Sequence, residues 1–198
     1  MRFADRDGID ALSMRRLGRE LGVEAMSLYN HVADKDDMLD GMVDMVWGEV
    51  KLPSSKGDWR AAIRGTGVSA HKLLVRHPWA CSLTISSGRL RLARLRYIDA
   101  ILGRLATAGF SDAHAYHAYH AIDSHVVGFS MWVNGHSMSA LQRSEPAGQT
   151  MLRDVTQELP HLAEHVQQHR SGVGSGVDEF SLILDFILDG LGKVRRSS

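Results

Sequence analysis

The sequence predicts an all-α protein made of a small N-terminal helix-turn-helix unit and a larger helical domain. No alternation of apolar and polar residues persists between turn signals, whereas apolar residues recur at spacings of three and four in nearly every segment. Residues that cap or end helices, such as Ser13, Asp34 and Gly22, punctuate these segments. With 198 residues, the chain has the length for one sizeable core plus one small module.

The same signals give the order of the helices. Ser111 and Asp178 stand where N-cap residues are expected, and Gly109 stands near a helix end. Helices are therefore predicted at residues 1–7, 14–21, 25–31, 35–50, 59–76, 89–107, 112–138, 151–169 and 179–194. The stretches 51–58 and 169–178 are rich in glycine, serine or proline and are predicted to be loops.

Composition predicts a cytoplasmic protein with no membrane partner. Hydrophobic residues make up 44% of the chain, yet no uninterrupted apolar run approaches the roughly 18 residues that a membrane span requires. The chain does not open with the basic, apolar and small-residue order of a signal peptide. Its lone cysteine, Cys81, cannot form an internal disulfide, and we expect it to be a small buried apolar residue.

The charges balance over the whole chain but not along it. Lys and Arg number 23, as do Asp and Glu, so the formal net charge is zero. Residues 1–50 carry a net charge of −5, residues 51–110 carry +9, and residues 111–198 carry −4. Any contact with nucleic acid must therefore come from a local basic or polar face, because the chain as a whole is not attracted to phosphate.

The stretch LGRELGVEAMSLYNHVADK, residues 17–35, predicts two short helices joined by a glycine turn. At about 100° per residue, the second helix divides into a polar and an apolar face. The polar face would hold Met26, Ser27, Asn30 and His31, and the apolar face Ala25, Leu28 and Val32. Gly22 suits the left-handed position that ends the first helix. Two short helices in this arrangement form a helix-turn-helix.

The polar face has the chemistry of a DNA groove reader. Asn30 could bond an adenine through two hydrogen bonds, and Met26 could contact a thymine methyl group. Serine and histidine side chains bond base edges or phosphates, and the hydroxyl of Tyr29 could reach a phosphate. Lys35 lies in the first turn of the next helix, where the helix end also attracts phosphate. The alternative is a surface helix whose polar face is merely solvated.

A family resemblance favours the DNA-binding interpretation. The segment LSMRRLGRELGVEAMSLYNHVADKDDMLDGMVD resembles the DNA-binding region of the TetR (tetracycline repressor-like) family of bacterial transcriptional regulators. The matching motifs are Leu12-Ser13-Met14-Arg15, Leu21-Gly22-Val23, Leu28-Tyr29-Asn30-His31-Val32 and Lys35. Weaker likeness runs through the remainder, in DWRAAIRGTGVSAHKLLVRHPW, GFSDAHAYHAY and FSLILDFILDGLGKV.

The resemblance implies an all-α homodimer and not an enzyme. It would consist of a DNA-binding domain at residues 1–50, with 35–50 as a connecting helix, and a ligand-binding and dimerisation domain at 51–198. It would bind a palindromic double-stranded operator as a repressor, and a small-molecule inducer would release it. The DNA-contacting positions would be Arg15, Ala25, Met26, Ser27, Tyr29, Asn30, His31 and Lys35. Asn30 replaces the tryptophan of the tetracycline repressors, which makes their operator doubtful here, and MRFADRDG corresponds to the middle of the family's first helix.

The ligand is less well specified by the sequence. The position of the metal-holding histidine of the tetracycline repressors aligns with Thr84, so a magnesium–tetracycline chelate is not supported, and no metal or other cofactor is expected. Large or polar residues on inward helix faces are the pocket candidates. They are His71, Trp79, Tyr97, His120, His125, Phe129 and Trp132. Each could equally be an ordinary core or interface residue.

Two further patterns bear on assembly and on an alternative function. Ile183, Leu184, Ile187 and Leu191 form an apolar stripe on the last helix, which predicts a four-helix dimer interface built with the 112–138 helix. The repeat of His161, His165 and His169 at spacing four could hold a metal. The triplet of His114, His117 and His120 has spacing three. The alternative function is therefore an all-α metal-dependent hydrolase that uses a histidine cluster, although the chain has no hydrolase or Walker motif.

Overall fold

The computed structural model describes residues 1–87, 89–135, 158–171 and 178–196, and these residues form helices and no strands. The helices are α1 (Arg2–Asp7), α2 (Met14–Leu21), α3 (Ala25–Leu28), α4 (Lys35–Gly48), α5 (Trp59–Arg76), α6 (Pro78–Ser86), α7 (Leu92–Thr107), α8 (Asp112–Gly135), α11 (Pro160–Arg170) and α12 (Glu179–Arg196). The predicted all-α class is confirmed. None of the described helices combines the length and hydropathy needed to cross a membrane.

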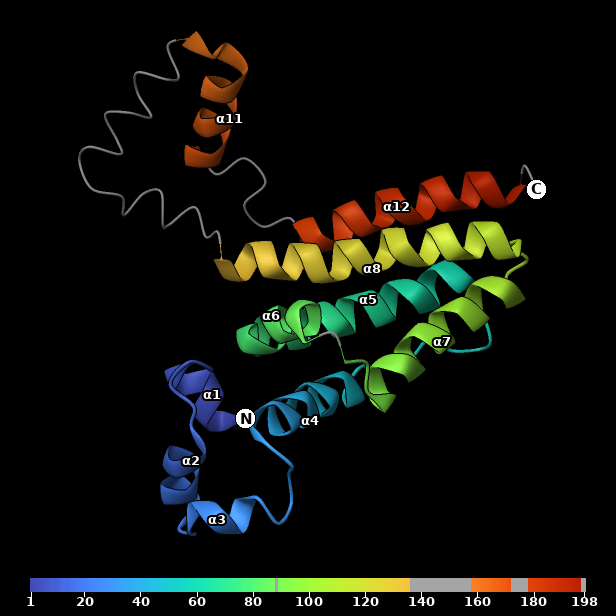
Figure 1. Cartoon of the computed structure of the whole chain (residues 1–198). Helices are drawn as coiled ribbons and strands as arrows, with labels where there is room; N and C mark the ends of the chain where they lie inside the picture. Colours follow the sequence, from blue (N-terminus) through green and yellow to red (C-terminus); the bar gives the residue numbers. More distant parts are fainter. Residues whose placement is uncertain (88, 136–157, 172–177, 197–198) are drawn as a thin grey trace.

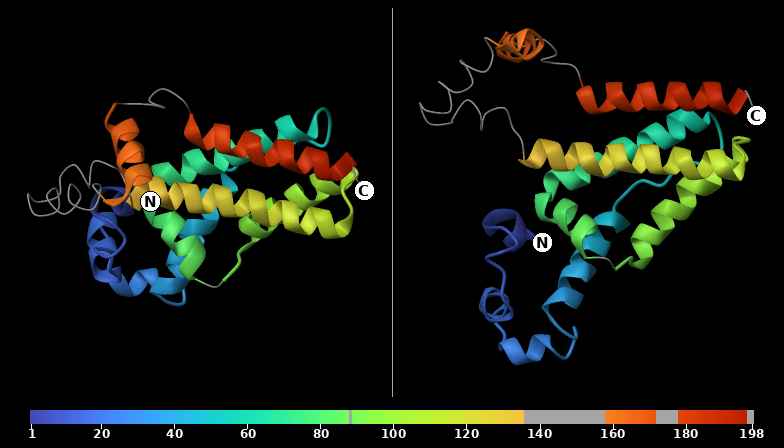
Figure 2. Two further views of the ribbon diagram at one scale, coloured as in Figure 1. Left: turned by 90° about the horizontal axis from the view of Figure 1, so that it is seen from above. Right: turned by 45° about the horizontal axis from the view of Figure 1, so that its top comes forward.

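The long helices form a bundle, and the N-terminal helices lie at one end of it (Figure 1). In all three ribbon views, α8 and α12 run side by side and antiparallel (Figures 1 and 2). Helix α5 packs against α8, and α7 packs against both α4 and α8. Helix α4 leads from α3 into the bundle, where it contacts α6 and α7. Helix α11 stands away from the bundle.

The core follows the apolar spacings that the sequence shows. Ile63, Ile122 and Leu184, from α5, α8 and α12, are fully buried against one another's helices. Trp47 of α4 meets Tyr97 of α7 with their ring centroids 4.9 Å apart. Burial of such side chains is the main favourable contribution to folding, at about 1.5 to 3 kcal/mol for each large apolar residue.

The predicted caps are present. The Ser13 hydroxyl accepts from the Arg16 backbone N–H at 3.2 Å, and the Asp34 carboxylate accepts from the Asp37 N–H at 2.7 Å. Asp178 accepts from the backbone N–H of Ser181 at 3.1 Å. Each bond satisfies one of the donors that the first turn of a helix leaves without a partner.

The structure differs from the predicted helices in several places. The described part of the predicted 151–169 helix begins only at Pro160, whereas residues 151–157, and 136–138 of the predicted 112–138 helix, lie outside the described residues. Helix α6 is absent from the predicted helices, because proline commonly follows the end of a helix. Pro78 instead stands at the first helical position of α6, which proline tolerates well. Helix α3 ends at Leu28 and not at residue 31. After it, Tyr29, Asn30 and His31 donate their N–H groups to carbonyls three residues back, so the chain continues in tight turns.

The division of the chain at residue 50 remains a prediction. Helix α1 contacts α6 and contributes Phe3 and Ala4 to the shared core, whereas α2 and α3 lie at the end of the bundle. Helix α4 belongs to the bundle by packing, since Leu39, Val46 and Trp47 are buried in the shared core. Helix α4 therefore joins helices α1–α3, called the N-terminal head from here on, to the bundle.

Candidate functional site

The turn between α2 and α3 is fixed by a close backbone approach. Gly22 adopts a left-handed conformation with φ 69°, and the N–H of Val23 donates to the Gly18 carbonyl at 2.9 Å. A Cβ atom at Gly18 would lie 2.8 Å from the Val23 carbonyl oxygen and 3.2 Å from the Ala25 nitrogen. Only glycine therefore lets α3 begin this close to α2.

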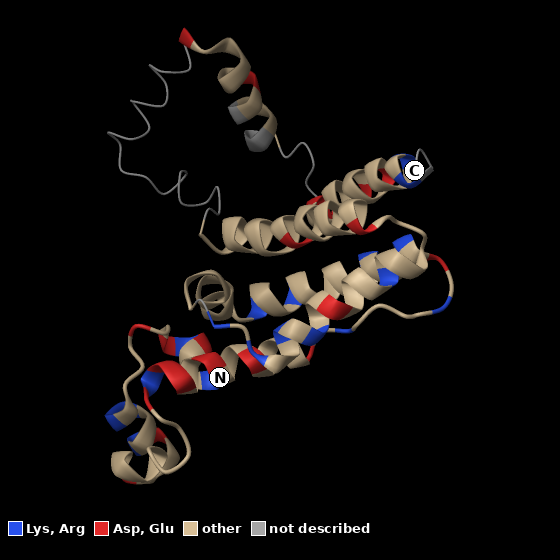
Figure 3. Ribbon diagram, turned by 45° about the vertical axis from the view of Figure 1, so that its right-hand side comes forward, with Lys and Arg blue, Asp and Glu red and all other residues tan. Residues whose placement is uncertain are grey.

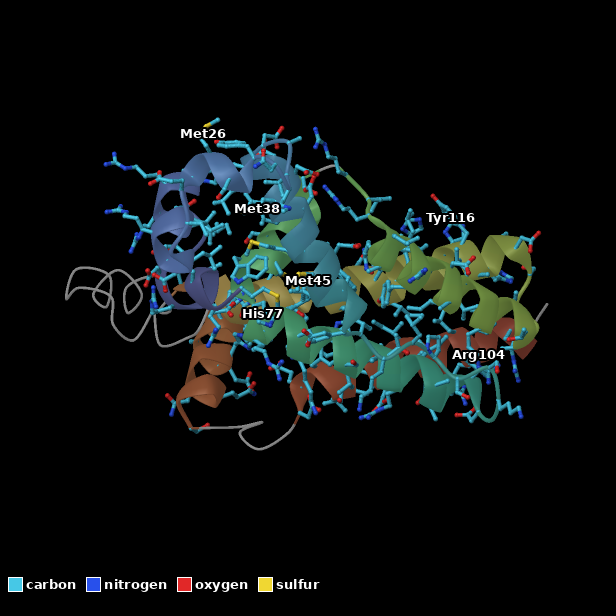
Figure 4. All side chains as sticks on the ribbon, turned by 90° about the horizontal axis from the view of Figure 1, so that it is seen from below. Met26, Met38, Met45, His77, Arg104 and Tyr116 are labelled. Carbon is cyan, nitrogen blue, oxygen red and sulfur yellow. The ribbon has the colours of Figure 1, made fainter. Side chains whose placement is uncertain are left out.

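The end of α3 presents side chains to solvent. Met26 is 74% exposed and Tyr29 is 45% exposed, and both Asn30 and His31 are exposed. Figure 4 shows Met26 projecting away from the rest of the molecule. On the other side, Leu28 is half-buried. Met26, Asn30 and His31 are thus exposed as predicted, although Asn30 and His31 lie in the turn after the helix. Ser27, which was also predicted on the outward face, is half-buried like Leu28.

Three of the predicted DNA-contacting residues are half-buried or bonded within the protein. The Ser27 hydroxyl donates to the Glu24 carbonyl at 2.7 Å, which leaves its oxygen as an acceptor for an outside partner. Ala25 is half-buried, so only part of its methyl group faces outward. Lys35 is half-buried at the start of α4, beside the Asp34 cap.

The basic residues near this surface fall into two sets. Arg6 bonds Asp7 and Glu20, and Arg16 bonds Asp7 at 2.9 Å, so these guanidinium groups are neutralised internally. Arg15 is exposed and forms no ion pair with any residue that the structure describes. Helix α3 itself carries no charged residue, and Figure 3 shows its tan ribbon below the blue segments of α2. Phosphate contacts are thus available beside an uncharged reading surface.

Four of the predicted pocket residues lie together under the start of α12. The His71 ring stacks on Phe180 at 4.0 Å, and His125 stacks on the same ring at 4.6 Å. The edge of Phe129 packs against Phe180 as well, and Trp132 meets Phe129 at 5.6 Å. Phe180 was not predicted as a pocket residue, because its periodicity marks it only as a core residue.

Two hydrogen bonds fix the histidine rings of this aromatic cluster. His71 Nδ1 shares a hydrogen bond with the Ser130 hydroxyl at 2.8 Å, and His125 Nε2 bonds the Phe180 carbonyl at 2.9 Å. Burial lowers the pKa of His71, because the charged ring loses its hydration there.

The other three predicted pocket residues lie elsewhere. Tyr97 is fully buried beside Trp47, between α4 and α7. Trp79 is buried near α1, and its indole N–H donates to Asp5 at 2.6 Å. His120 is exposed on α8, edge-on to Tyr116 at 4.5 Å. The seven candidates therefore do not line one cavity.

Recesses open between helices at other places. A narrow one of about 20 Å³, enough for a single water molecule, lies between α4, α6 and α7, and its lining includes Asp40, Trp47, Thr84, Ser87, Arg89 and Arg94. A second of about 340 Å³ adjoins it and shares Asp40, Ser87 and Arg89. A third of about 300 Å³ is lined by Ile9, Trp79 and Met131, among others. No sequence pattern marks Asp40 and Arg94 as buried, because charged residues are usually solvated.

Thr84, at the position aligned with a metal-holding histidine, takes part in an ordinary hydrogen-bonded chain. Its hydroxyl accepts from the Trp47 indole N–H at 3.0 Å and donates to the Ala80 carbonyl at 2.7 Å. Among the described residues, no three His, Cys, Asp or Glu side chains lie close enough to hold a metal ion. His161 and His165 are exposed on α11, and the side chain of His169 lies outside the described residues.

The predicted dimer stripe needs one correction. Leu184 is fully buried in the protomer's own core, beside Gly67, so it is not available to a second copy. Ile183, Ile187 and Leu191 are half-buried. The apolar side chains that face outward on α8 and α12 are instead Tyr116, Trp132, Leu182 and Phe186, each between 41% and 65% exposed.

Comparison with known proteins agrees with this geometry. Residues 52–195 match the family model described as the tetracyclin repressor-like C-terminal domain. A helix-turn-helix-type transcriptional regulator of Saccharopolyspora erythraea is 41% identical over 80% of this chain and 68% of its own length. The transcriptional repressor DrrR1 of Streptomyces coeruleorubidus is 31% identical over 96% of this chain and 73% of its own.

The fold is also found in a solved structure. The TetR family protein ActR of Streptomyces coelicolor, in complex with (S)-DNPA, superposes with a TM-score of 0.71. It is 26% identical and covers 96% of this chain and 91% of its own. The helix-turn-helix and the all-α body, together with these relatives, define the class of this protein as a transcriptional regulator. This chain belongs to the TetR (tetracycline repressor-like) family. The family assignment favours regulation over the metal-dependent hydrolase.

Proposed function

We propose that this protein is a cytoplasmic, dimeric repressor that binds a palindromic double-stranded operator through α3 and is released by a small molecule. The observation that carries the proposal is the exposed, uncharged end of α3, with Met26, Tyr29, Asn30 and His31 turned to solvent. Exposed apolar and amide side chains at the tip of a helix-turn-helix match the base edges of a major groove. The similarity to the repressor DrrR1 supports the repressing role.

Each exposed side chain has a role in this proposal. Asn30 reads an adenine, Met26 contacts a thymine methyl group, and His31 and Ser27 accept or donate at base edges or phosphates. Arg15, Tyr29 and Lys35 bind phosphates and fix the register of the head on the duplex. The larger helical domain carries no catalytic step in this account.

Release by a small molecule is supported by likeness to proteins that hold one. The similar ActR structures contain (S)-DNPA in one case and actinorhodin in another. In this chain, α4 links the head to the bundle and lines two recesses through Asp40. A molecule bound there releases DNA only if it binds the DNA-free arrangement more tightly, by about 1 to 3 kcal/mol for useful coupling.

The test is a footprint on the DNA that flanks the protein's own gene. We expect protection of a palindrome whose half-sites repeat at about one turn of the duplex or a small multiple. Lys35→Ala should weaken binding to all sequences alike and lower the slope of log K against log salt by about one. Affinity for this DNA that equals the affinity for random DNA would contradict the proposal.

A further inference from the structure

A recess at the junction of the N-terminal head and the bundle has walls from three parts of the chain. Ile9, in the loop that follows α1, belongs to the wall on the head. Pro78 and Ser82, in the first turns of α6, belong to the second wall, and Met131 and Asn134, at the end of α8, belong to the third. Figure 1 shows α1 close to α6, which it contacts. A molecule in this recess therefore touches the head and the bundle at once.

The recess is large enough for one substituted ring and is open to solvent. Its volume is about 300 Å³, at the lower end of the range for small-molecule sites. An apolar cavity of about 150 Å³ is already enough to hold a benzene molecule. Ser82 is exposed and Met131 is 46% exposed, so a ligand reaches the recess from solvent.

The walls of the recess are mainly apolar and carry no charge. Besides Ile9 and Pro78 they include Trp79, Cys81 and Met131, and none of the described residues that line the recess is charged. An ion placed here would lose hydration without gaining a counter-charge, so the walls favour a neutral molecule. A thioether packs favourably against an aromatic ring, so Met131 favours an aromatic one.

Two polar side chains line the recess, and both have hydrogen-bonding capacity to spare. Asn134 Nδ2 donates to the Leu74 carbonyl at 3.0 Å, which holds the amide in one orientation. No described residue donates to Asn134 Oδ1, and the Ser82 hydroxyl forms no hydrogen bond with any described residue. Asn134 is half-buried and Ser82 is exposed, so neither side chain is closed off from a ligand. An amide oxygen only accepts hydrogen bonds, so it is complementary to a hydroxyl group.

We propose that this recess binds a small neutral phenol. The ring lies against Ile9, Trp79 and Met131, and the hydroxyl group donates to Asn134 Oδ1. The bound phenol adds contacts between the head and the bundle, so it holds the head in the position that the structure shows. The site shares no lining residue with the two recesses beside α4. Its occupation requires no DNA, and the proposal therefore goes beyond the proposed function.

The test measures binding of 4-ethylphenol to the full chain without DNA, by calorimetry at pH 7, where a phenol is neutral. Two related probes separate the contributions to binding. 4-Ethylanisole, the methyl ether, has no hydroxyl hydrogen to donate and should bind at least about threefold more weakly. 4-Hydroxyphenylacetate carries a carboxylate and should bind at least about tenfold more weakly, since the recess offers no cation. Equal affinities for the three probes would overturn the proposal.

A pair of variants locates the site on α6. Ser82→Phe fills the recess with a ring of its own and should weaken 4-ethylphenol binding at least about tenfold. Ser86→Phe adds the same side chain one turn further along α6, beside the second recess, and should change the affinity less than about threefold. Both serines are exposed, and melting curves check that both variants are folded. Unchanged binding in Ser82→Phe, or a loss in Ser86→Phe instead, would show that the phenol does not occupy this recess.

A second pair of variants tests the wall on the head. Ile9→Ala removes apolar contacts with the ring and should weaken 4-ethylphenol binding by about three- to tenfold. Asp10→Ala is the control, because Asp10 is exposed and does not line the recess. An affinity that Ile9→Ala leaves unchanged would place the phenol on the bundle alone and would refute its contact with the head.

Discussion

Asp5 in α1 joins two residues that follow it by more than seventy positions. Its Oδ1 atom bonds His77 Nδ1 at 2.7 Å and accepts from the Trp79 indole N–H at 2.6 Å. His77 and Trp79 are buried at the junction of α5 and α6, and Figure 4 shows His77 close to α1. This carboxylate therefore ties the N-terminal head to the bundle at a second point, besides α4.

We predict that Asp5→Ala destabilises the protein in a pH-dependent way. Burial raises the pKa of Asp5, but the hydrogen bonds from His77 and Trp79 outweigh it and hold the pKa below its ordinary value. A carboxyl group with a lowered pKa stabilises the fold above its unfolded value of about 3.9 and loses this effect as pH falls through the folded value. The free energy of unfolding should drop by about 1 to 3 kcal/mol at pH 7.

Urea denaturation between pH 3 and pH 7 checks this prediction. The difference between the wild type and Asp5→Ala should shrink below about pH 4. Asp10→Ala is the control, because Asp10 is exposed in the neighbouring loop and should give the same stability as the wild type. A difference that stays constant down to pH 3 would show that the carboxylate is not the source of the effect.

The exposed residues of α3 were predictable from the sequence, and the buried polar ones were not. The outward position of Met26 follows from helical periodicity, which places it on the same face as its polar neighbours. The burial of Asp40 and Arg94 depends on which helices pack together, and a single sequence does not contain that information in its periodicity. The aromatic cluster around Phe180 was found in part, since His71, His125 and Phe129 were chosen for size and polarity.

For the helices, the residues that cap or end them decided which bounds could be predicted from the sequence. The bounds of α2 and α5 were predicted to the residue, because Ser13 caps α2, Gly22 ends it, and the loop predicted at residues 51–58 ends where α5 begins. Helix α6 was missed because proline both ends helices and begins them. Helix α3 was predicted too long, because the tight turns at residues 29–31 keep a spacing similar to that of a helix.

We predict that Gly18→Ala weakens both folding and DNA binding. The added methyl group would press on the Val23 carbonyl and the Ala25 nitrogen, and neither backbone atom moves without shifting α3. Such overpacking typically costs about 1 to 3 kcal/mol. Gly41→Ala is the matched control, since its methyl group on α4 would meet nothing within 4 Å and should stabilise that helix by up to about 1 kcal/mol. Thermal unfolding gives the stability difference. Similar melting temperatures for the two variants would rule out the close approach.

At the scale of the whole molecule, the outward face of α8 and α12 is the expected site of dimerisation. Leu182 and Phe186 on α12 are 42% and 65% exposed, and Trp132 extends the apolar surface along α8. Figure 3 shows few charges on these helices over most of their length. A paired copy would cover this surface through contacts related by a two-fold axis.

Phe186→Asp should therefore give monomers in light scattering while leaving the fold intact, because most of that side chain faces solvent in the protomer. A charge placed in a buried interface lacks both water and a partner, which is strongly unfavourable. Leu95→Asp on α7 is the control, since Leu95 is 45% exposed on another helix and should leave the dimer unchanged. A folded Phe186→Asp protein that remains dimeric would place the interface elsewhere.

If the exposed end of α3 reads DNA sequence, Asn30→Ala should bind operator and random duplexes with different losses of affinity. Asn30 is exposed and forms no hydrogen bond through its side chain with any described residue. We expect operator binding to weaken by about 1 to 3 kcal/mol, with discrimination relaxed at one base pair, while binding to random DNA and the melting temperature stay unchanged. Full operator affinity and specificity in Asn30→Ala, or an equal loss on both duplexes, would contradict the claim.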